Sequence, residues 1–290
     1  MLSIVICTRN RPAFLMRCLE TLTEKKDSFE VLVVDQSDVP VALPEDPRCR
    51  RIATRELGLA AGRNKGICAA AGNVVAFVDD DTVPDSDYVR TLEEIFNRDV
   101  NLAAVAGRIL TLEDGHPYTR LHDSTARELC RNDWPRFMGG NFAIRREVAE
   151  KVGPFDERFG AGRRWASGEE TDYFFRLLYQ NYRVVYGPSI IVRHPREAVD
   201  AAPRELRTKL LAYGRGQGAV IAHHLIDFDN YRMFILLIWV VVKSCLRVVQ
   251  NAFILRPRSA LLHATVALGK CIGFFEFIQS VGRGRRVHSE

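Results

Sequence analysis

The chain has 290 residues, of which 27% are charged and 47% hydrophobic. This is the composition of an ordinary globular protein, and it excludes a disordered or collagen-like chain. The formal net charge of +5 is an average over two unlike parts. Residues 1–200 hold 28 Lys and Arg against 31 Asp and Glu, a net of −3, whereas residues 201–290 hold 13 against 5, a net of +8. We therefore expect two regions that divide near residue 200.

Cysteine usage points to a reducing compartment. The seven cysteines are odd in number, spread along the chain and never spaced as C-x-x-C. This pattern argues against a disulfide framework and a cysteine zinc cluster. The N-terminal run 1–9 has no basic segment before its short apolar stretch, so it does not resemble a signal peptide. We expect a cytoplasmic protein.

The first region alternates short apolar runs with helical stretches, which is the pattern of a mostly parallel sheet with helices on both faces. Strands are expected at 4–7, 31–34, 74–78 and 102–109, and helices at 12–22, 60–71 and 87–97. The sequence thus predicts a Rossmann-like, doubly wound α/β fold.

The second half of this region is more mixed. A Gly-rich loop at 160–168 leads into a helix expected at 169–179, and two strands are expected at 184–186 and 190–192. A long Gly-rich loop is usually functional or mobile, so this one is a candidate lid over a substrate. The glycine-rich run 214–218 lies outside any βαβ context, and we expect a loop there.

Acidic side chains follow two of the expected strands. Asp35 follows 31–34, and Asp79, Asp80 and Asp81 follow 74–78. Ligands bind at the carboxyl ends of strands in doubly wound folds. Three consecutive carboxylates repel one another, and a bound Mg²⁺ or Mn²⁺ offsets that repulsion while leaving positions for phosphate oxygens. The alternative is a solvated acidic turn that caps the next helix.

A second acidic cluster opens the helix expected at 169–179. Glu169 and Asp172 share one face of that helix, and Glu170 points about 100° away. A carboxylate here suits a general base, although it is also a plain helix cap. Arg63 is a candidate for balancing phosphate charge, or alternatively lies on a solvated helix face.

Taken in order, these motifs resemble the GT-A-fold glycosyltransferases of family 2, which are inverting enzymes that use nucleotide-sugar donors. The resemblance runs from Ser3 to about Pro195. It rests on six segments: SIVICTRNR at 3–11, VVDQS at 33–37, 58–66 with its Arg-Asn pair, FVDDD at 77–81, GGNF at 139–142 followed by Arg145-Arg146, and GEETD at 168–172 followed by Arg176.

The resemblance implies that residues 1–110 bind the nucleotide and that residues 111–200 handle the acceptor. It also implies a role for each matching residue. Thr8 and Arg9 would line the base pocket, and Asp35 would bind the base, which is uracil in the commonest donors. Asp81 would hold the metal, with Asp79 as a second ligand, and Asp79 or Asp80 would face the ribose. His194 follows the last strand, where some relatives supply a histidine to the metal; a lone histidine is also often structural.

The same resemblance implies the mechanism. Glu170 stands where the family usually has an Asp that acts as the catalytic base, so Glu169 and Asp172 stay as alternatives. The base would deprotonate an acceptor hydroxyl of a glycan or lipid-linked molecule, which then displaces the nucleoside diphosphate with inversion. Gly140, with Asn141 beside it, would allow close approach of the donor sugar.

The basic last third carries long apolar stretches. Met233–Val242 is apolar throughout, and Lys243, Arg247 and Asn251 then form one polar stripe; a second apolar stretch covers Leu261–Val281. Such helices suit the surface of an anionic membrane. We therefore expect a peripheral protein on the inner face of the membrane. The alternatives are helices packed on the core or on a second subunit, as in a homodimer, and a transmembrane hairpin.

Three other functions were weighed against a glycosyltransferase. Val78–Val83 also fits the D-x-D-x-[TV] motif of a haloacid-dehalogenase-like phosphatase with Asp79 as nucleophile, but the later strands lack a further acidic pair. A non-catalytic membrane-attached scaffold conflicts with the intact acids. Nucleic acid binding is not expected, because the basic residues alternate with aliphatic runs.

Overall fold

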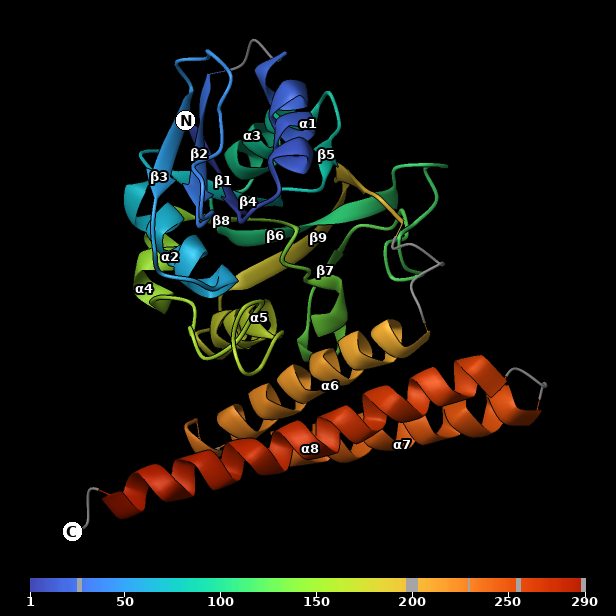
Figure 1. The fold of residues 1–290 in the computed structure, drawn as a ribbon. Helices are drawn as coiled ribbons and strands as arrows, with labels where there is room; N and C mark the ends of the chain where they lie inside the picture. Colours follow the sequence, from blue (N-terminus) through green and yellow to red (C-terminus); the bar gives the residue numbers. More distant parts are fainter. Residues whose placement is uncertain (25–27, 197–202, 229, 254–256, 288–290) are drawn as a thin grey trace. The chain divides into compact units, whose positions relative to one another are not determined.

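A computed structural model of the protein describes residues 1–24, 28–196, 203–228, 230–253 and 257–287 (Figure 1). The chain forms two units. The first consists of Met1–Phe155 and Tyr173–Glu197, and the second of Asp156–Asp172 and Ala198–Glu290. The segment 156–172 therefore groups with the C-terminal region rather than with the sheet, and the predicted boundary at residue 200 lies outside the described residues.

The first unit is built on a nine-stranded mixed sheet within the described residues, with the order β3-β2-β1-β4-β8-β6-β9-β5 and with β7 paired to β9. The strands are β1 (Leu2–Thr8), β2 (Phe29–Asp35), β3 (Cys49–Ala53), β4 (Val74–Asp79), β5 (Val83–Pro84), β6 (Leu102–Thr111), β7 (Arg127–Glu128), β8 (Asn141–Arg145) and β9 (Arg183–His194). Strands β3, β2, β1 and β4 are parallel, and β8 is antiparallel to both β4 and β6.

Helices cover both faces of this sheet, as Figure 1 shows. They are α1 (Pro12–Thr23), α2 (Leu59–Ala69), α3 (Tyr88–Arg98), the 3₁₀-helix η1 (Arg131–Arg136), α4 (Arg146–Val152) and α5 (Glu169–Tyr179), which begins in the second unit. Side chains alternate along β1. Ile4 and Ile6 join a core with α1 and α3, whereas Val5 meets α2, where a Cβ on Gly66 would lie 2.3 Å from it.

The predicted fold class is confirmed, with several differences in detail. Strands β3, β5, β7 and β8 and the helix α4 were not predicted. The two strands expected at 184–186 and 190–192 are one strand, β9, whose pairing with β6 shifts register after Gly187. The chain there bulges instead of turning back, so both halves pair with the same neighbour.

The described part of the second unit contains three long helices, α6 (Pro203–Ile226), α7 (Arg232–Phe253) and α8 (Pro257–Val287). The expected loop at 214–218 is wrong, because these residues lie within α6. Their glycines serve a close helix contact: a Cβ on Gly218 would lie 1.9 Å from the Lys270 carbonyl oxygen, and one on Gly273 would lie 1.9 Å from that of Arg215. Small residues at four-residue spacing let two helix backbones approach.

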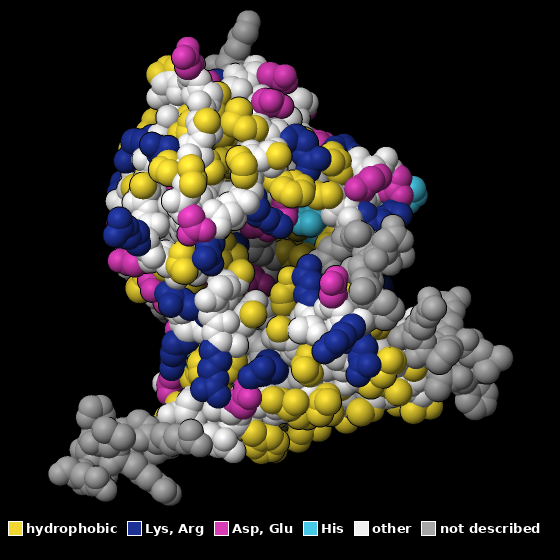
Figure 2. All heavy atoms as spheres, viewed as in Figure 1, with side chains coloured by type: hydrophobic (Ala, Val, Ile, Leu, Met, Phe, Trp, Pro, Cys, Tyr) yellow, Lys and Arg dark blue, Asp and Glu magenta, His cyan; other side chains and the backbone are white. Residues whose placement is uncertain are grey.

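Two of these helices are long and apolar enough to cross a membrane, judged by length and composition alone. They are Arg232–Asn251, with a mean hydropathy of 1.9, and Ser259–Val281, with 1.5. Most of each stretch is not buried inside the protein. Figure 2 shows hydrophobic side chains gathered along the surface of these helices.

Candidate functional site

The acids at the carboxyl end of β4 form the centre of a polar cluster. Thr8, the last residue of the neighbouring strand β1, donates a hydrogen bond to Asp80 at 2.7 Å. The Arg11 guanidinium bridges two acids, with Nη1 2.8 Å from Asp80 and 2.9 Å from Asp81. Arg11 thus offsets the repulsion among the carboxylates. Arg11 lies in the 3–11 motif, but its role was not predicted from the sequence.

His194, at the end of β9, completes the cluster beside Asp81. Its Nε2 lies 3.3 Å from the Asp81 carboxylate, and its Nδ1 lies 2.6 Å from the Pro195 carbonyl oxygen. A carbonyl only accepts, so Nδ1 carries a proton, and Nε2 is the ring nitrogen that faces Asp81. Tyr118 packs on the ring at 4.9 Å between centroids. A carboxylate and an oriented imidazole fit a divalent cation.

Arg63 is a buried partner of Asp79, the first acid of the cluster. Its guanidinium is 3% exposed, lies 3.7 Å from the Asp79 carboxylate and donates to the Gly139 carbonyl at 2.9 Å. The rings of Phe77, Phe142 and Phe155 surround it at 5.7–5.8 Å. A guanidinium this deeply buried excludes the solvated helix face and lies where it can hold Asp79, while its role in balancing phosphate charge stays a prediction.

The Gly-Gly-Asn segment also supports Asp79. A Cβ on Gly140 would lie 2.4 Å from Asp79 Oδ2, so the chain's own carboxylate accounts for this glycine. The Asn141 side chain is 1% exposed, and the approach of its backbone to the donor sugar stays a prediction. Its amide donates to the carbonyls of Arg108 and Ile190 at 2.9 and 3.0 Å, which ties β8 to β6 and β9.

Asp35, at the end of β2, shapes the loop that follows it. Its two carboxylate oxygens accept from the backbone N–H groups of Ser37 at 3.0 Å and Val41 at 2.9 Å. Asn10, which has a φ of 56°, links the ends of β1 and β2 by pairing with Asp38. Arg9 beside it is exposed. These residues thus meet at the edge of the sheet where a base was expected to bind.

The pKa values of two carboxyl groups in this cluster, those of Asp79 and Asp80, are shifted toward the neutral form. Burial raises the pKa of Asp79, a shift that Arg63 opposes and the neighbouring Asp81 and Asp80 increase. Burial likewise raises the pKa of Asp80, opposed by the hydrogen bond from Thr8. A bound cation would favour the ionised forms of both, so the cluster holds carboxylates that gain from a positive ligand.

The acids that open α5 have different surroundings. Asp172 is fully buried and accepts from His224 Nε2 at 2.9 Å, with His223 Nε2 3.5 Å from the same oxygen. Glu169 is 4% exposed and faces Gly160, where a Cβ would lie 2.9 Å from its carboxylate. Glu170 is more accessible than either. The histidines were missed because they lie 51 and 52 residues further along the chain.

The Gly-rich loop before α5 is packed within its own unit. Trp165 is 5% exposed, and its ring lies 5.0 Å from that of Phe277 in α8. The Gly160 N–H donates to the Trp165 carbonyl at 2.8 Å. An anchored tryptophan is not what a mobile lid presents, so the structure differs here from the expectation.

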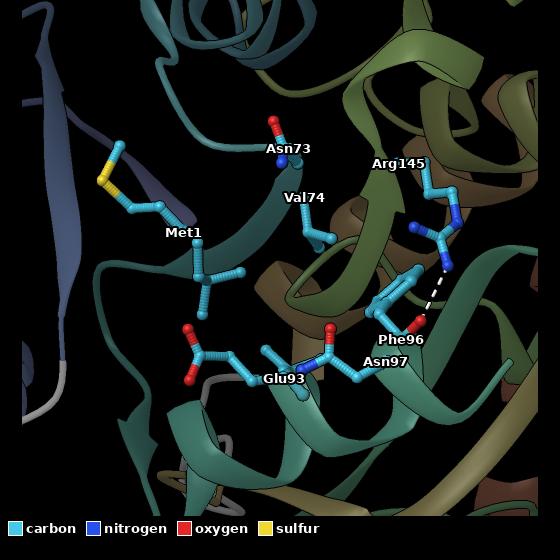
Figure 3. A pocket seen from close by; sticks show the side chains of 9 residues that line it. Met1, Asn73, Val74, Glu93, Phe96, Asn97 and Arg145 are labelled. Atoms are coloured by element: carbon cyan, nitrogen blue, oxygen red, sulfur yellow. Dashed lines mark hydrogen bonds between the residues drawn. The ribbon is translucent and has the colours of Figure 1, made fainter. Parts of the chain in front are cut away.

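A surface pocket in the first unit lies away from these acids. Met1, Asn73, Glu93, Asn97 and Arg145 are among the residues that line it (Figure 3). The Arg145 guanidinium donates to the backbone carbonyls of Leu102, Phe96 and Asp99 at 2.8–2.9 Å. Its charge is thus engaged by the chain, and the pocket lies at the amino end of β1 and β4, opposite the end where such folds bind ligands.

Comparison with known proteins now decides the family. The family model described as "Glycosyl transferase family 2" matches residues 3–153. The chain belongs to glycosyl transferase family 2. It is a glycosyltransferase, which removes the phosphatase and the non-catalytic scaffold from the alternatives.

Related sequences carry the same activity in their names. The chain is 26% identical over 256 residues to "Glycosyltransferase AglE" of Haloferax volcanii, covering 83% of this chain and 80% of the relative. It is 28% identical over 208 residues to the "Pre-mycofactocin glycosyltransferase" of Mycobacterium tuberculosis, covering 66% of this chain and 42% of the relative. It is 25% identical over 152 residues to the "Glucosyl-dolichyl phosphate glucuronosyltransferase" of Haloferax volcanii, covering 47% of each.

Solved structures share the fold of this glycosyltransferase. The mannosyltransferase PcManGT of Pyrobaculum calidifontis, solved in complex with GDP-Man and Mn²⁺, matches with a TM-score of 0.64 and 15% identity, covering 95% of this chain and 87% of that one. The S. aureus TarS structure matches with a TM-score of 0.53 and 14% identity, covering 79% and 45%.

Proposed function

We propose that this family 2 glycosyltransferase moves a sugar from a nucleoside-diphosphate sugar to a hydroxyl of a glycan or lipid-linked acceptor, with inversion and with the help of Mg²⁺ or Mn²⁺. The observation that carries the proposal is the polar cluster at the carboxyl ends of β1, β4 and β9. It brings Thr8, Arg11 and His194 within hydrogen-bond or ion-pair distance of Asp80 and Asp81.

The donor half of the site has a distinct task for each side chain. Asp81 and His194, with Asp79, would hold the cation, which supplies a positive charge for the departing diphosphate. Thr8, Arg9 and Asp35 would bind the base, and Asp80 the ribose. Arg63 and Gly140 keep the Asp79 carboxylate in one position, and Arg11 is free to contribute a guanidinium to the diphosphate when a cation takes over its acids.

The acceptor half depends on a base. Glu170 is the carboxylate at the start of α5 that water reaches most easily, so it would take the proton from the attacking hydroxyl. Burial restricts Glu169 and Asp172 to supporting roles. The attack displaces the diphosphate from the opposite face of the sugar, which gives inversion in a single step.

The identity of the donor is open to a direct comparison. UDP-sugars are the first to test, because the family resemblance gives Asp35 the role of binding the base, which is uracil in the commonest donors. GDP-sugars are next, because the mannosyltransferase with the same fold was solved with GDP-Man. A lipid-linked acceptor is supported by the relative named for glucosyl-dolichyl phosphate.

Membrane association is part of the proposal. Ile235, Ile238, Val242, Leu246 and Val249 form one exposed face of α7, each between 49% and 64% exposed. This face lies opposite the buried side of the helix, and residues 201–290 carry a net charge of +8. An apolar face flanked by cations fits the surface of an anionic bilayer, and such a location would bring the enzyme to lipid-linked acceptors.

The deciding experiment is a panel of nucleotide sugars assayed for hydrolysis and transfer with Mn²⁺. We expect turnover of at least one donor and a loss of about 10³-fold in Asp81→Ala, because the charge on the leaving diphosphate then lacks its cation. Asp87→Ala is the matched control, since Asp87 is an exposed acid at the start of α3. No turnover with any donor, or full activity in Asp81→Ala, would overturn the proposal.

A further inference from the structure

We propose that Asp172, His223 and His224 form a zinc site in the second unit, separate from the donor cation. The three side chains come from the start of α5 and from the last turn of α6, and all are buried. One carboxylate oxygen, Asp172 Oδ1, is the common neighbour of both rings, 2.9 Å from His224 Nε2 and 3.5 Å from His223 Nε2.

The distances match ligands of a common ion. Two atoms bound tetrahedrally to zinc at about 2.0–2.1 Å lie roughly 3.3 Å apart. The two separations above bracket this value. Two imidazoles with one carboxylate are a donor set that suits zinc.

A second carboxylate orients one of the rings. Asp227 Oδ2 lies 2.7 Å from His223 Nδ1, which Arg158 Nη2 also approaches at 3.1 Å. In the tautomer whose Nδ1 donates to Asp227, the Nε2 lone pair faces Asp172. Zinc-binding histidines are commonly held by a carboxylate at the other ring nitrogen in this way. Asp227 stands four residues after His223, just beyond the end of α6.

The Asp172 carboxylate is the most buried acid of the cluster. Its side chain is fully buried, whereas Asp156 and Asp227 are partly exposed and lie 2.6 and 3.6 Å from the Arg158 guanidinium. A buried carboxylate is costly unless a positive partner offsets its charge, and a divalent cation bound by the two imidazoles would supply that charge.

The site would join α6 to the start of α5. Glu170 precedes Asp172 by two residues, so a zinc ion here would fix the helix turn that carries the base; this consequence rests on the proposed function, whereas the metal site itself does not. Zinc in this position is structural, and it differs from the donor cation in ligands and in its independence of the nucleotide sugar.

The test is metal content and spectroscopy on the full chain without donor. We expect about one zinc ion per chain after purification without chelators, and a visible tetrahedral Co²⁺ spectrum on exchange. His224→Gln and Asp172→Asn should abolish both signals, whereas Asp81→Ala should retain them. The matched control is His116→Gln, which changes an exposed histidine in the first unit.

A milder variant covers the case in which ligand variants fail to fold. Asp227→Asn keeps the three ligands and alters only the partner of His223 Nδ1, so the affinity for Co²⁺ should fall about 10–100-fold. The proposal would be overturned by a wild-type protein that carries no zinc and whose bound Co²⁺ is all lost in Asp81→Ala. The same result would leave the proposed glycosyl transfer untouched, since that is measured by turnover.

Discussion

The carboxylates at the start of α5 differ in what they can reach. Glu170 is partly exposed, whereas Glu169 is 4% exposed and Asp172 is fully buried. We expect Glu170→Gln to lower kcat by about 10²–10⁴-fold, which is the usual contribution of a general base, with little change in the free energy of unfolding. Steady-state kinetics beside urea unfolding measure this. Glu147→Gln, at an exposed acid of α4, serves as the control, and an unchanged kcat in Glu170→Gln would assign the base elsewhere.

Gly140 offers a test of how the donor acids are positioned. A Cβ at this residue would lie 2.4 Å from Asp79 Oδ2, which is the end of a side chain and therefore able to move. We expect Gly140→Ala to fold but to displace the carboxylate, with a loss of about 10²-fold in kcat/KM, as for other misplacements of about 1 Å. Kinetics with varied Mn²⁺ should show weaker activation. Wild-type kinetics in this variant would mean that the position of Asp79 does not matter.

His122 should make stability depend on pH. It is fully buried, and burial, with the nearby charge of Arg136, lowers its pKa to about 4. The unfolded chain therefore binds more protons than the native state between about pH 4 and pH 6.5, so stability is complete above that range and falls as the pH drops through it. From pH 8 to pH 5 the loss is about 2 kcal/mol.

Urea unfolding at both pH values, in wild type and in His122→Leu, isolates this contribution. Other groups titrate alike in both proteins, so the difference between their pH profiles reports on His122 alone. His116→Gln, at an exposed histidine, should keep the wild-type profile. A His122→Leu profile parallel to that of the wild type would contradict the assignment.

Most donor-site residues could be located from the sequence because they follow neighbouring parallel strands, whose carboxyl ends lie at the same edge of the sheet. Asp35 and the acids at 79–81 end β2 and β4, which flank β1. The partners that decide side-chain roles could not be located in this way. Arg63 and Asn141 are polar residues that the fold buries for its own hydrogen bonds, and no local pattern distinguishes such a residue from one that binds a ligand.

Among whole elements, the strongest patterns gave the best predictions. The α5 helix has the predicted bounds, because its helical periodicity follows a glycine loop. The short strands β3 and β8 were missed, since β3 is mostly polar at an edge and β8 is only five residues long. The glycines of α6 were misassigned to a loop because glycine marks both turns and close helix contacts, and the sequence alone does not show the neighbouring helix.

The contact between α6 and α8 reverses the usual effect of removing a helix glycine. Alanine normally stabilises a helix interior by about 1 kcal/mol relative to glycine. At Gly218, however, a Cβ would lie 1.9 Å from a backbone oxygen of α8. The backbone of α8 can move away from this Cβ only if the two helices separate. We expect Gly218→Ala to destabilise the second unit by about 1–3 kcal/mol.

Thermal unfolding followed by circular dichroism at the helix band measures this effect. Thr208→Ala, at an exposed position of the same helix, should leave the midpoint unchanged or raise it. Gly273→Ala, on the opposite side of the contact, should repeat the loss. A higher midpoint in Gly218→Ala would show that the two helices do not approach this closely.

On the scale of the whole molecule, the charge asymmetry and the exposed apolar face of α7 belong to the same region. We expect the full chain to co-sediment with vesicles that contain an anionic phospholipid, and less so as salt is raised, because screening weakens the attraction. The double variant Ile238→Glu/Leu246→Glu places charges on the apolar face and should reduce the partition coefficient about tenfold or more. Val39→Glu/Val100→Glu, at exposed valines of the first unit, should bind as the wild type does. Equal vesicle binding of all three proteins would exclude this face as the membrane contact. If the wild type instead fails to bind vesicles and forms a dimer that only Ile238→Glu/Leu246→Glu dissociates, the face belongs to the contact with a second copy of the chain.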